Sequence, residues 1–139
     1  SDVYLAMMED GILSSLENYW EFYQQHFQKE DDLGCVSAQE AIEVIRGAGG
    51  TPVLAHPKLI GDDEQVKSLL KQGIKGLEVY HPVHDSSDVE KYYNLSQKND
   101  LLITGGTDWH GELTVSDAGL GDYGLQEAAF NKLGAGDKN

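Results

Sequence analysis

Hydrophobic positions change from helical spacing to short continuous runs several times along the chain, and this pattern predicts the order of its elements. Between residues 12 and 27 apolar side chains recur every three or four positions, and Ser14 with Glu17 forms a capping box, so we expect a helix there. The stripe consists of Leu16, Trp20, Tyr23 and Phe27. We interpret it as core packing, ended by the polar break KEDDLG.

Three further helices are predicted, and each is followed by a short apolar run. The pairs are a capped helix between Ser37 and Gly47 with the run TPVLA, a helix at roughly 63–72 with GLEVY, and a helix at about 87–98 with LLIT. Helices that alternate with short apolar strands favour α/β units with parallel strands. A modest helical segment from Leu125 to Leu133 is also expected.

The predicted fold class is therefore α/β, with parallel strands and helices preceded by a helical segment. Only about three strands can be identified, whereas a closed α/β barrel typically takes roughly 200 residues or more. Either the sheet is small and open, or strands of a larger sheet lie outside this sequence. We expect residues 1–139 to form a single domain or fragment, with a helical segment at 1–34, α/β units at 35–125 and a tail at 126–139.

The composition limits which macromolecules and ligands the chain is expected to bind. The formal net charge of -14 opposes binding to duplex nucleic acid or to an anionic membrane. Arg46 is the only arginine, so metal ions would have to supply most of the positive charge for a phosphate ligand. No membrane span or signal peptide is visible, which makes the cytoplasm the expected compartment, and the single Cys35 is expected to be inert.

Polar residues follow each of the three predicted strands. His56 ends the first, His81 and His84 follow the second, and Asp108 and His110 follow the third. The carboxyl ends of parallel strands form one edge, where ligands bind in α/β folds. We therefore expect these side chains to converge.

Asp108 and His110 are two residues apart, so an extended backbone would point both at one ion while Trp109 packs elsewhere. Carboxylate with neutral imidazole suits Zn²⁺, Mn²⁺ or Fe²⁺ better than Ca²⁺. Gly105 and Gly106 would let the backbone bend sharply and approach an ion or substrate closely.

Each of these residues also has a simpler interpretation. His56 precedes Pro57, where an extended backbone is favoured whatever the side chain does. His81 and His84 could be solvated loop residues, and Glu78 an outward-facing strand residue. His26 is expected to interact with a helix end. Convergence at three successive strand ends nevertheless favours a common site.

The motifs VLAHP, GLEVYHPVH and TGGTDWHG resemble the last motifs of the PHP (polymerase and histidinol phosphatase) domain family of metal-dependent phosphoesterases. The segment EDGILSSLENYWEFYQQHF, followed by VSAQEAIEVIRGAGG, is similar to the stretch that precedes those motifs in the branch acting on small phosphate compounds such as nucleotides. The resemblance covers residues 1 to about 125.

This resemblance implies the C-terminal part of a distorted (β/α)7 barrel that holds two or three divalent metal ions, Mn, Zn or Fe. It implies that His56, Asp108 and His110 are metal ligands. By the same resemblance Lys58, His81 and His84 are substrate-binding candidates that bind phosphate or protonate the leaving oxygen. The function implied is hydrolysis of small phosphate esters.

The sequence departs from the family at its start, because it has no HxH motif and no equivalent glutamate upstream of His56. We therefore expect the chain to be the C-terminal portion of a longer enzyme, inactive alone and prone to self-association through uncovered strand edges. Two other functions stay open: an amidohydrolase-like barrel hydrolase, and a non-catalytic binding or regulatory module.

Overall fold

The computed structural model describes residues 2–14, 18, 21–22, 36–109, 118–127 and 130–131. The chain divides into two compact units, Ser1–Ser37 with His110–Leu113, and Ala38–Trp109 with Thr114–Asn139. In the first unit, α1 (Asp2–Glu9) is a helix that the hydrophobic pattern did not predict. The predicted helix at 12–27 lies largely outside the described residues. Of the predicted segment from Leu125 to Leu133, Glu127, Phe130 and Asn131 are described as helical, while Leu125 and Gln126 precede the helix.

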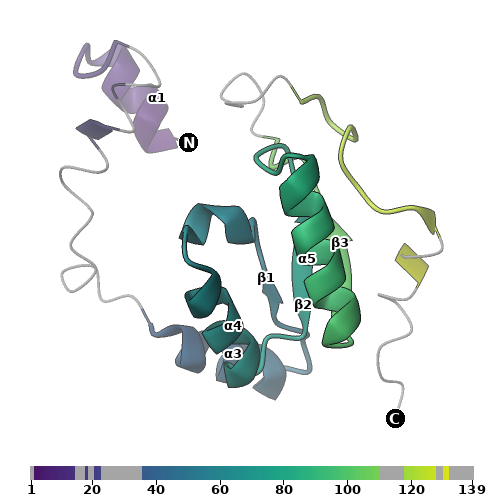
Figure 1. Ribbon diagram of the computed structural model, residues 1–139. Coiled ribbons are helices and arrows are strands. Elements are labelled where there is room, and N and C mark those ends of the chain that lie inside the picture. Colours follow the sequence, from purple (N-terminus) through teal and green to yellow (C-terminus); the bar gives the residue numbers. More distant parts are fainter. Residues whose placement is uncertain are drawn as a thin grey trace. The chain divides into compact units, whose positions relative to one another are not determined.

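The second unit contains the predicted α/β arrangement (Figure 1). Its described residues form a parallel sheet of β1 (Val53–Leu54), β2 (Gly76–Tyr80) and β3 (Leu102–Gly105), in the order β1-β2-β3. The helices between and before them are α3 (Ala38–Gly47), the 3₁₀ helix η2 (Pro57–Ile60), α4 (Asp63–Gln72) and α5 (Ser86–Lys98). The fold class is therefore confirmed as α/β with parallel strands.

Helix ends are defined by the residues that the sequence suggests. The Asp62 carboxylate accepts hydrogen bonds from the backbone at the start of α4, and the helix ends at Gly73 in a left-handed conformation. Asp85 and Asp88 form a reciprocal capping box at the start of α5. Asp85 is thus the N-cap residue of α5.

The core of this unit lies between β2 and α5. Leu77 and Val79 lie on the same face of β2, because side chains two apart in a strand share a face. Both are fully buried, and they pack with Tyr92 of α5. Glu78 lies between them in the sequence and therefore belongs to the other face of the sheet. Among the described residues, no helix is long and apolar enough to cross a membrane.

The pairing of β2 with β3 shifts at the end where the site lies. Glu78 pairs with Thr104, but Tyr80 pairs with Gly105, so β2 has one extra residue over this interval. A Cβ atom on Gly105 would lie 2.8 Å from Tyr80 Cβ and 2.9 Å from Tyr80 O. The absence of a side chain at Gly105 therefore serves close strand packing.

Candidate functional site

Three imidazole rings gather where β1 and β2 end. The ring centroids of His56 and His81 are 5.5 Å apart, and those of His81 and His84 are 5.8 Å apart. Asp108 follows β3, with its Oδ2 atom 3.6 Å from His81 Nε2. The structure thus brings together four of the six predicted site residues, while His110 lies outside the described part of the chain.

His56 has an unusual backbone conformation, with φ 28° and ψ 61°. The expectation of an extended backbone before Pro57 is wrong, because the chain turns at His56 directly into η2. The Glu78 Oε2 atom accepts a hydrogen bond from the His56 backbone N–H at 2.9 Å. Glu78 is therefore a contact of the site and not simply an outward-facing strand residue.

Asp108 also lies in the left-handed region, with φ 51°. The extended geometry assumed for the Asp108 to His110 stretch therefore does not hold at its first residue. A short polar side chain such as aspartate tolerates this conformation better than most. Its carboxylate is 58% exposed, in contrast to the buried His81 beside it.

His81 is buried, with 4% of its surface exposed. The Val83 backbone N–H donates to His81 Nδ1 at 3.2 Å, so this nitrogen carries a lone pair. A neutral His81 then has its proton on Nε2, the atom nearest Asp108. His81 Nε2–H can donate to an oxygen atom.

His84 has the opposite arrangement. Its Nδ1 atom lies 2.9 Å from the Val79 carbonyl oxygen, which can only accept, so Nδ1 carries the proton. His84 Nε2 therefore presents a lone pair. The ring is 6% exposed and packs against Tyr92, with 5.1 Å between ring centroids.

The Nε2 atoms of both His81 and His84 are buried and have no hydrogen-bond partner among the residues that the structure describes. An unsatisfied buried polar atom costs about 1–3 kcal/mol, so two in one cluster indicate a place for a ligand. His84 has the form typical of a metal-binding histidine, with its other ring nitrogen bonded to a carbonyl. The cluster thus fits a divalent metal in donor chemistry. Among the described residues no group of three His, Cys, Asp or Glu side chains lies at ligating distances.

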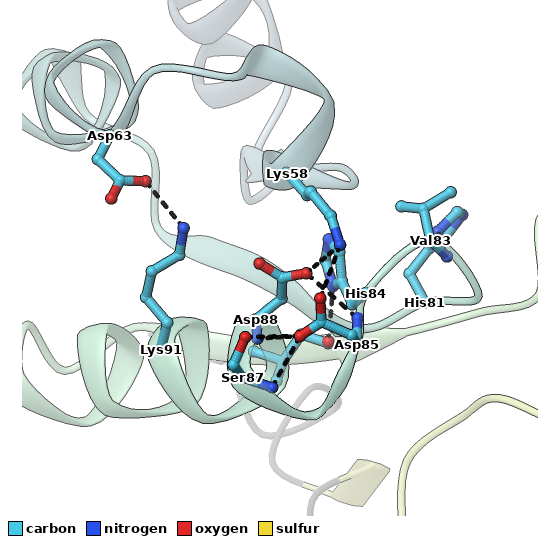
Figure 2. A network of polar contacts seen from close by, with 10 residues as sticks. Lys58, Asp63, His81, Val83, His84, Asp85, Ser87, Asp88 and Lys91 are labelled. Carbon is cyan, nitrogen blue, oxygen red and sulfur yellow. Dashed lines mark hydrogen bonds and ion pairs between the residues drawn. The ribbon is translucent and has the colours of Figure 1, made fainter.

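Lys58 lies beside this cluster but contacts carboxylates (Figure 2). Its ammonium group is 3.1 Å from Asp85 Oδ2 and also pairs with Asp88. Hydrogen bonds to Asp88 and then Asp85 raise the pKa of Lys58. The contact connects η2, which follows His56, to the start of α5, which follows His84.

Asp85 is the centre of this network. The Ser87 hydroxyl donates to Asp85 Oδ1 at 2.6 Å, and the Asp88 backbone N–H donates to the same atom at 3.1 Å. These two hydrogen bonds, and to a smaller extent the one from Lys58, lower the pKa of the Asp85 carboxyl well below its ordinary value. Asp85 is therefore ionised wherever the site would work, and it fixes the loop that holds His84.

The chain is similar to known phosphoesterases. A curated relative from Eggerthella lenta, a phosphoribosyl 1,2-cyclic phosphate 1,2-diphosphodiesterase, is 35% identical over 81 residues, which are 58% of this chain and 31% of the relative. A solved structure from Bifidobacterium adolescentis, described as a metal-dependent phosphoesterase, aligns with a TM-score of 0.64 and 26% identity.

That alignment covers 92% of this chain and 46% of the other. The chain therefore spans less than half the length of either protein. No model of a known protein family matches it. The two likenesses confirm the predicted resemblance to PHP-type, metal-dependent phosphoesterases.

Proposed function

We propose that this chain is part of a metal-dependent phosphoesterase that hydrolyses esters of small phosphorylated compounds, nucleotides and cyclic sugar phosphates among them. The observation that carries the proposal is the pair of buried Nε2 atoms of His81 and His84, which lie at the carboxyl end of a parallel sheet and accept or donate no hydrogen bond among the described residues. Support comes from the names of the relative and of the structural neighbour. The β1-β2-β3 sheet would be part of a distorted (β/α)7 barrel.

We assign His56, Asp108 and His110 to the metal ions, with His84 Nε2 as a further lone pair suited to a ligand. Bound divalent ions would neutralise phosphate charge and lower the pKa of water. Mn, Zn and Fe all suit imidazole and carboxylate donors. The metal's identity, a count of two or three ions, and a cytoplasmic location stay predictions.

The tautomers separate the roles of the two buried histidines. His81 Nε2–H can donate to a phosphoryl or leaving-group oxygen, whereas His84 Nε2 can only accept or ligate. Lys58 stays a candidate for phosphate binding, but its ammonium would have to exchange carboxylate partners for a phosphate oxygen.

The test is a comparison of substrate classes with the full-length protein. After removal of metal by a chelator, the protein is supplied with Mn²⁺, Zn²⁺ or Fe²⁺ and assayed on nucleoside monophosphates, a cyclic phosphodiester and a set of amides. We expect metal-dependent hydrolysis of phosphate esters alone. Hydrolysis of amides would favour an amidohydrolase-like enzyme, and metal binding without any hydrolysis would favour a binding module.

A further inference from the structure

Glu78 is the polar residue in the middle of β2, and its carboxylate joins the ends of two strands. The β1-β2 ladder pairs Val53 with Gly76 and Leu54 with Leu77, and β1 ends there. Two residues later, the His56 backbone N–H donates a hydrogen bond to Glu78 Oε2, with 2.9 Å between the nitrogen and the oxygen. A side-chain oxygen thus replaces the backbone partner at this position.

The hydrogen bond falls on a strained residue. His56 has φ 28°, in the region that side chains with a Cβ rarely adopt, and conformations of this kind persist only where surrounding contacts hold them. The bond with Glu78 is such a contact, since it fixes the N–H of the strained residue itself. The backbone turn at His56 places its ring next to that of His81, with 5.5 Å between the ring centroids.

The other oxygen of the carboxylate lies close to the third strand. A Cβ atom on Gly106 would be 3.5 Å from Glu78 Oε1, which is ordinary van der Waals contact. Glu78 is half-buried in β2, so its position is fixed by the sheet. The carboxylate is therefore next to the exits of β1 and β3 while belonging to β2.

We propose that Glu78 is a positioning residue of the site: its carboxylate holds the His56 backbone in the left-handed turn that aims the imidazole at the histidine cluster. The proposal rests on the proposed function for the role of His56 as a metal ligand. It assigns Glu78 no contact with the metal or the substrate. Partners that orient a ligand in this way typically change metal affinity about 10–100-fold when they are removed.

The test compares Glu78→Gln with Glu78→Ala in the full-length protein. Glutamine keeps an oxygen that can accept the His56 N–H, whereas alanine removes the acceptor. The matched control is Glu90→Ala, which removes an exposed glutamate of α5. Two quantities are measured: the Mn²⁺ dissociation constant by calorimetry, and the hydrogen-exchange protection of the His56 amide by NMR in the metal-free protein.

We expect Glu78→Ala to weaken Mn²⁺ binding about tenfold or more and to remove protection of the His56 amide. Glu78→Gln and Glu90→Ala should keep both close to the wild-type values. Equal loss of metal affinity in the Gln and Ala variants, with the His56 amide still protected in the Gln variant, would identify Glu78 as a ligand and overturn the positioning role. Unchanged values in Glu78→Ala would overturn it as well.

The two proposals fail in different ways. A wild-type protein that binds no Mn²⁺ contradicts the proposed function, whatever the His56 amide shows. A wild-type protein that binds Mn²⁺, with a Glu78→Ala variant that binds it equally well, contradicts the inference on Glu78 alone.

Discussion

Two backbone contacts decide what the buried imidazoles can do. Val83 donates to His81 Nδ1 and Val79 accepts from His84 Nδ1, so one ring offers a proton at Nε2 and the other a lone pair. Neither valine has a side chain with chemistry of its own. The loop HPVH after β2 thus builds a donor and an acceptor three residues apart.

At this scale we predict that His81→Ala in the metal-loaded, full-length protein lowers kcat/KM for a phosphate ester by about 100-fold or more, because a positioned proton donor is lost. Mn²⁺ affinity should change little. The measurement is steady-state kinetics beside calorimetric titration. A His81→Ala variant that keeps its kcat/KM but loses metal affinity would contradict the donor role.

The sequence was enough to single out these histidines as site candidates, but not to predict their burial or their tautomers. Their place after an apolar run identified the sheet edge, since parallel strands end together. Their burial, and the bonds that select each tautomer, depend on how the loop folds back on β2. The only sign of Glu78 in the sequence is that it is the one charged residue in the run GLEVY. Its hydrogen-bond partner is a backbone N–H, which no sequence pattern reveals.

At the scale of elements, the start of α5 ties the site to the fold. Asp85 caps the helix, pairs with Lys58 from η2 and directly follows His84. The cap was predictable, because Asp, Ser and Ser precede the helical pattern and Asp88 completes a capping box. The ion pair with Lys58 was not, since it joins residues 27 positions apart.

The lowered pKa of Asp85 predicts a dependence of stability on pH. A carboxyl whose pKa is lower in the folded state stabilises it above the unfolded pKa of about 4, and this contribution is lost as pH falls below that value. Asp85→Asn keeps a capping oxygen but removes the titrating group. Urea unfolding of the full-length protein from pH 7 downward should therefore show a smaller loss of unfolding free energy in Asp85→Asn than in wild type. Identical losses would contradict this assignment.

Gly105, the last residue of β3, and Gly106, which follows it, should differ in their tolerance of a side chain. Gly105→Ala would place Cβ 2.8 Å from Tyr80 Cβ, and such overpacking typically costs about 1–3 kcal/mol. Gly106→Ala is the matched control, because the nearest atom to its Cβ would be Glu78 Oε1 at an ordinary 3.5 Å. Urea unfolding should show a clearly lower free energy of unfolding for Gly105→Ala only. Equal effects of the two variants would contradict the close-packing role.

At the scale of the molecule, the hydrophobic pattern predicted the described α/β unit well because α4 and α5 begin at side-chain caps and each strand is a short apolar run. The run TPVLA yields only the two-residue strand β1, since the chain must turn at His56 to enter η2. The acidic charge and single arginine make sense if metal ions complete the phosphate site.

The most direct measurement is phosphate-ester hydrolysis by the full-length protein, freed of metal and then titrated with Mn²⁺, beside a His56→Asn variant. Asparagine tolerates the left-handed backbone of position 56 but removes the imidazole. We predict that Mn²⁺ restores hydrolysis in wild type, while the variant needs at least about tenfold more Mn²⁺ or stays inactive. Hydrolysis that is independent of added metal, or an Mn²⁺ requirement unchanged in His56→Asn, would contradict the account.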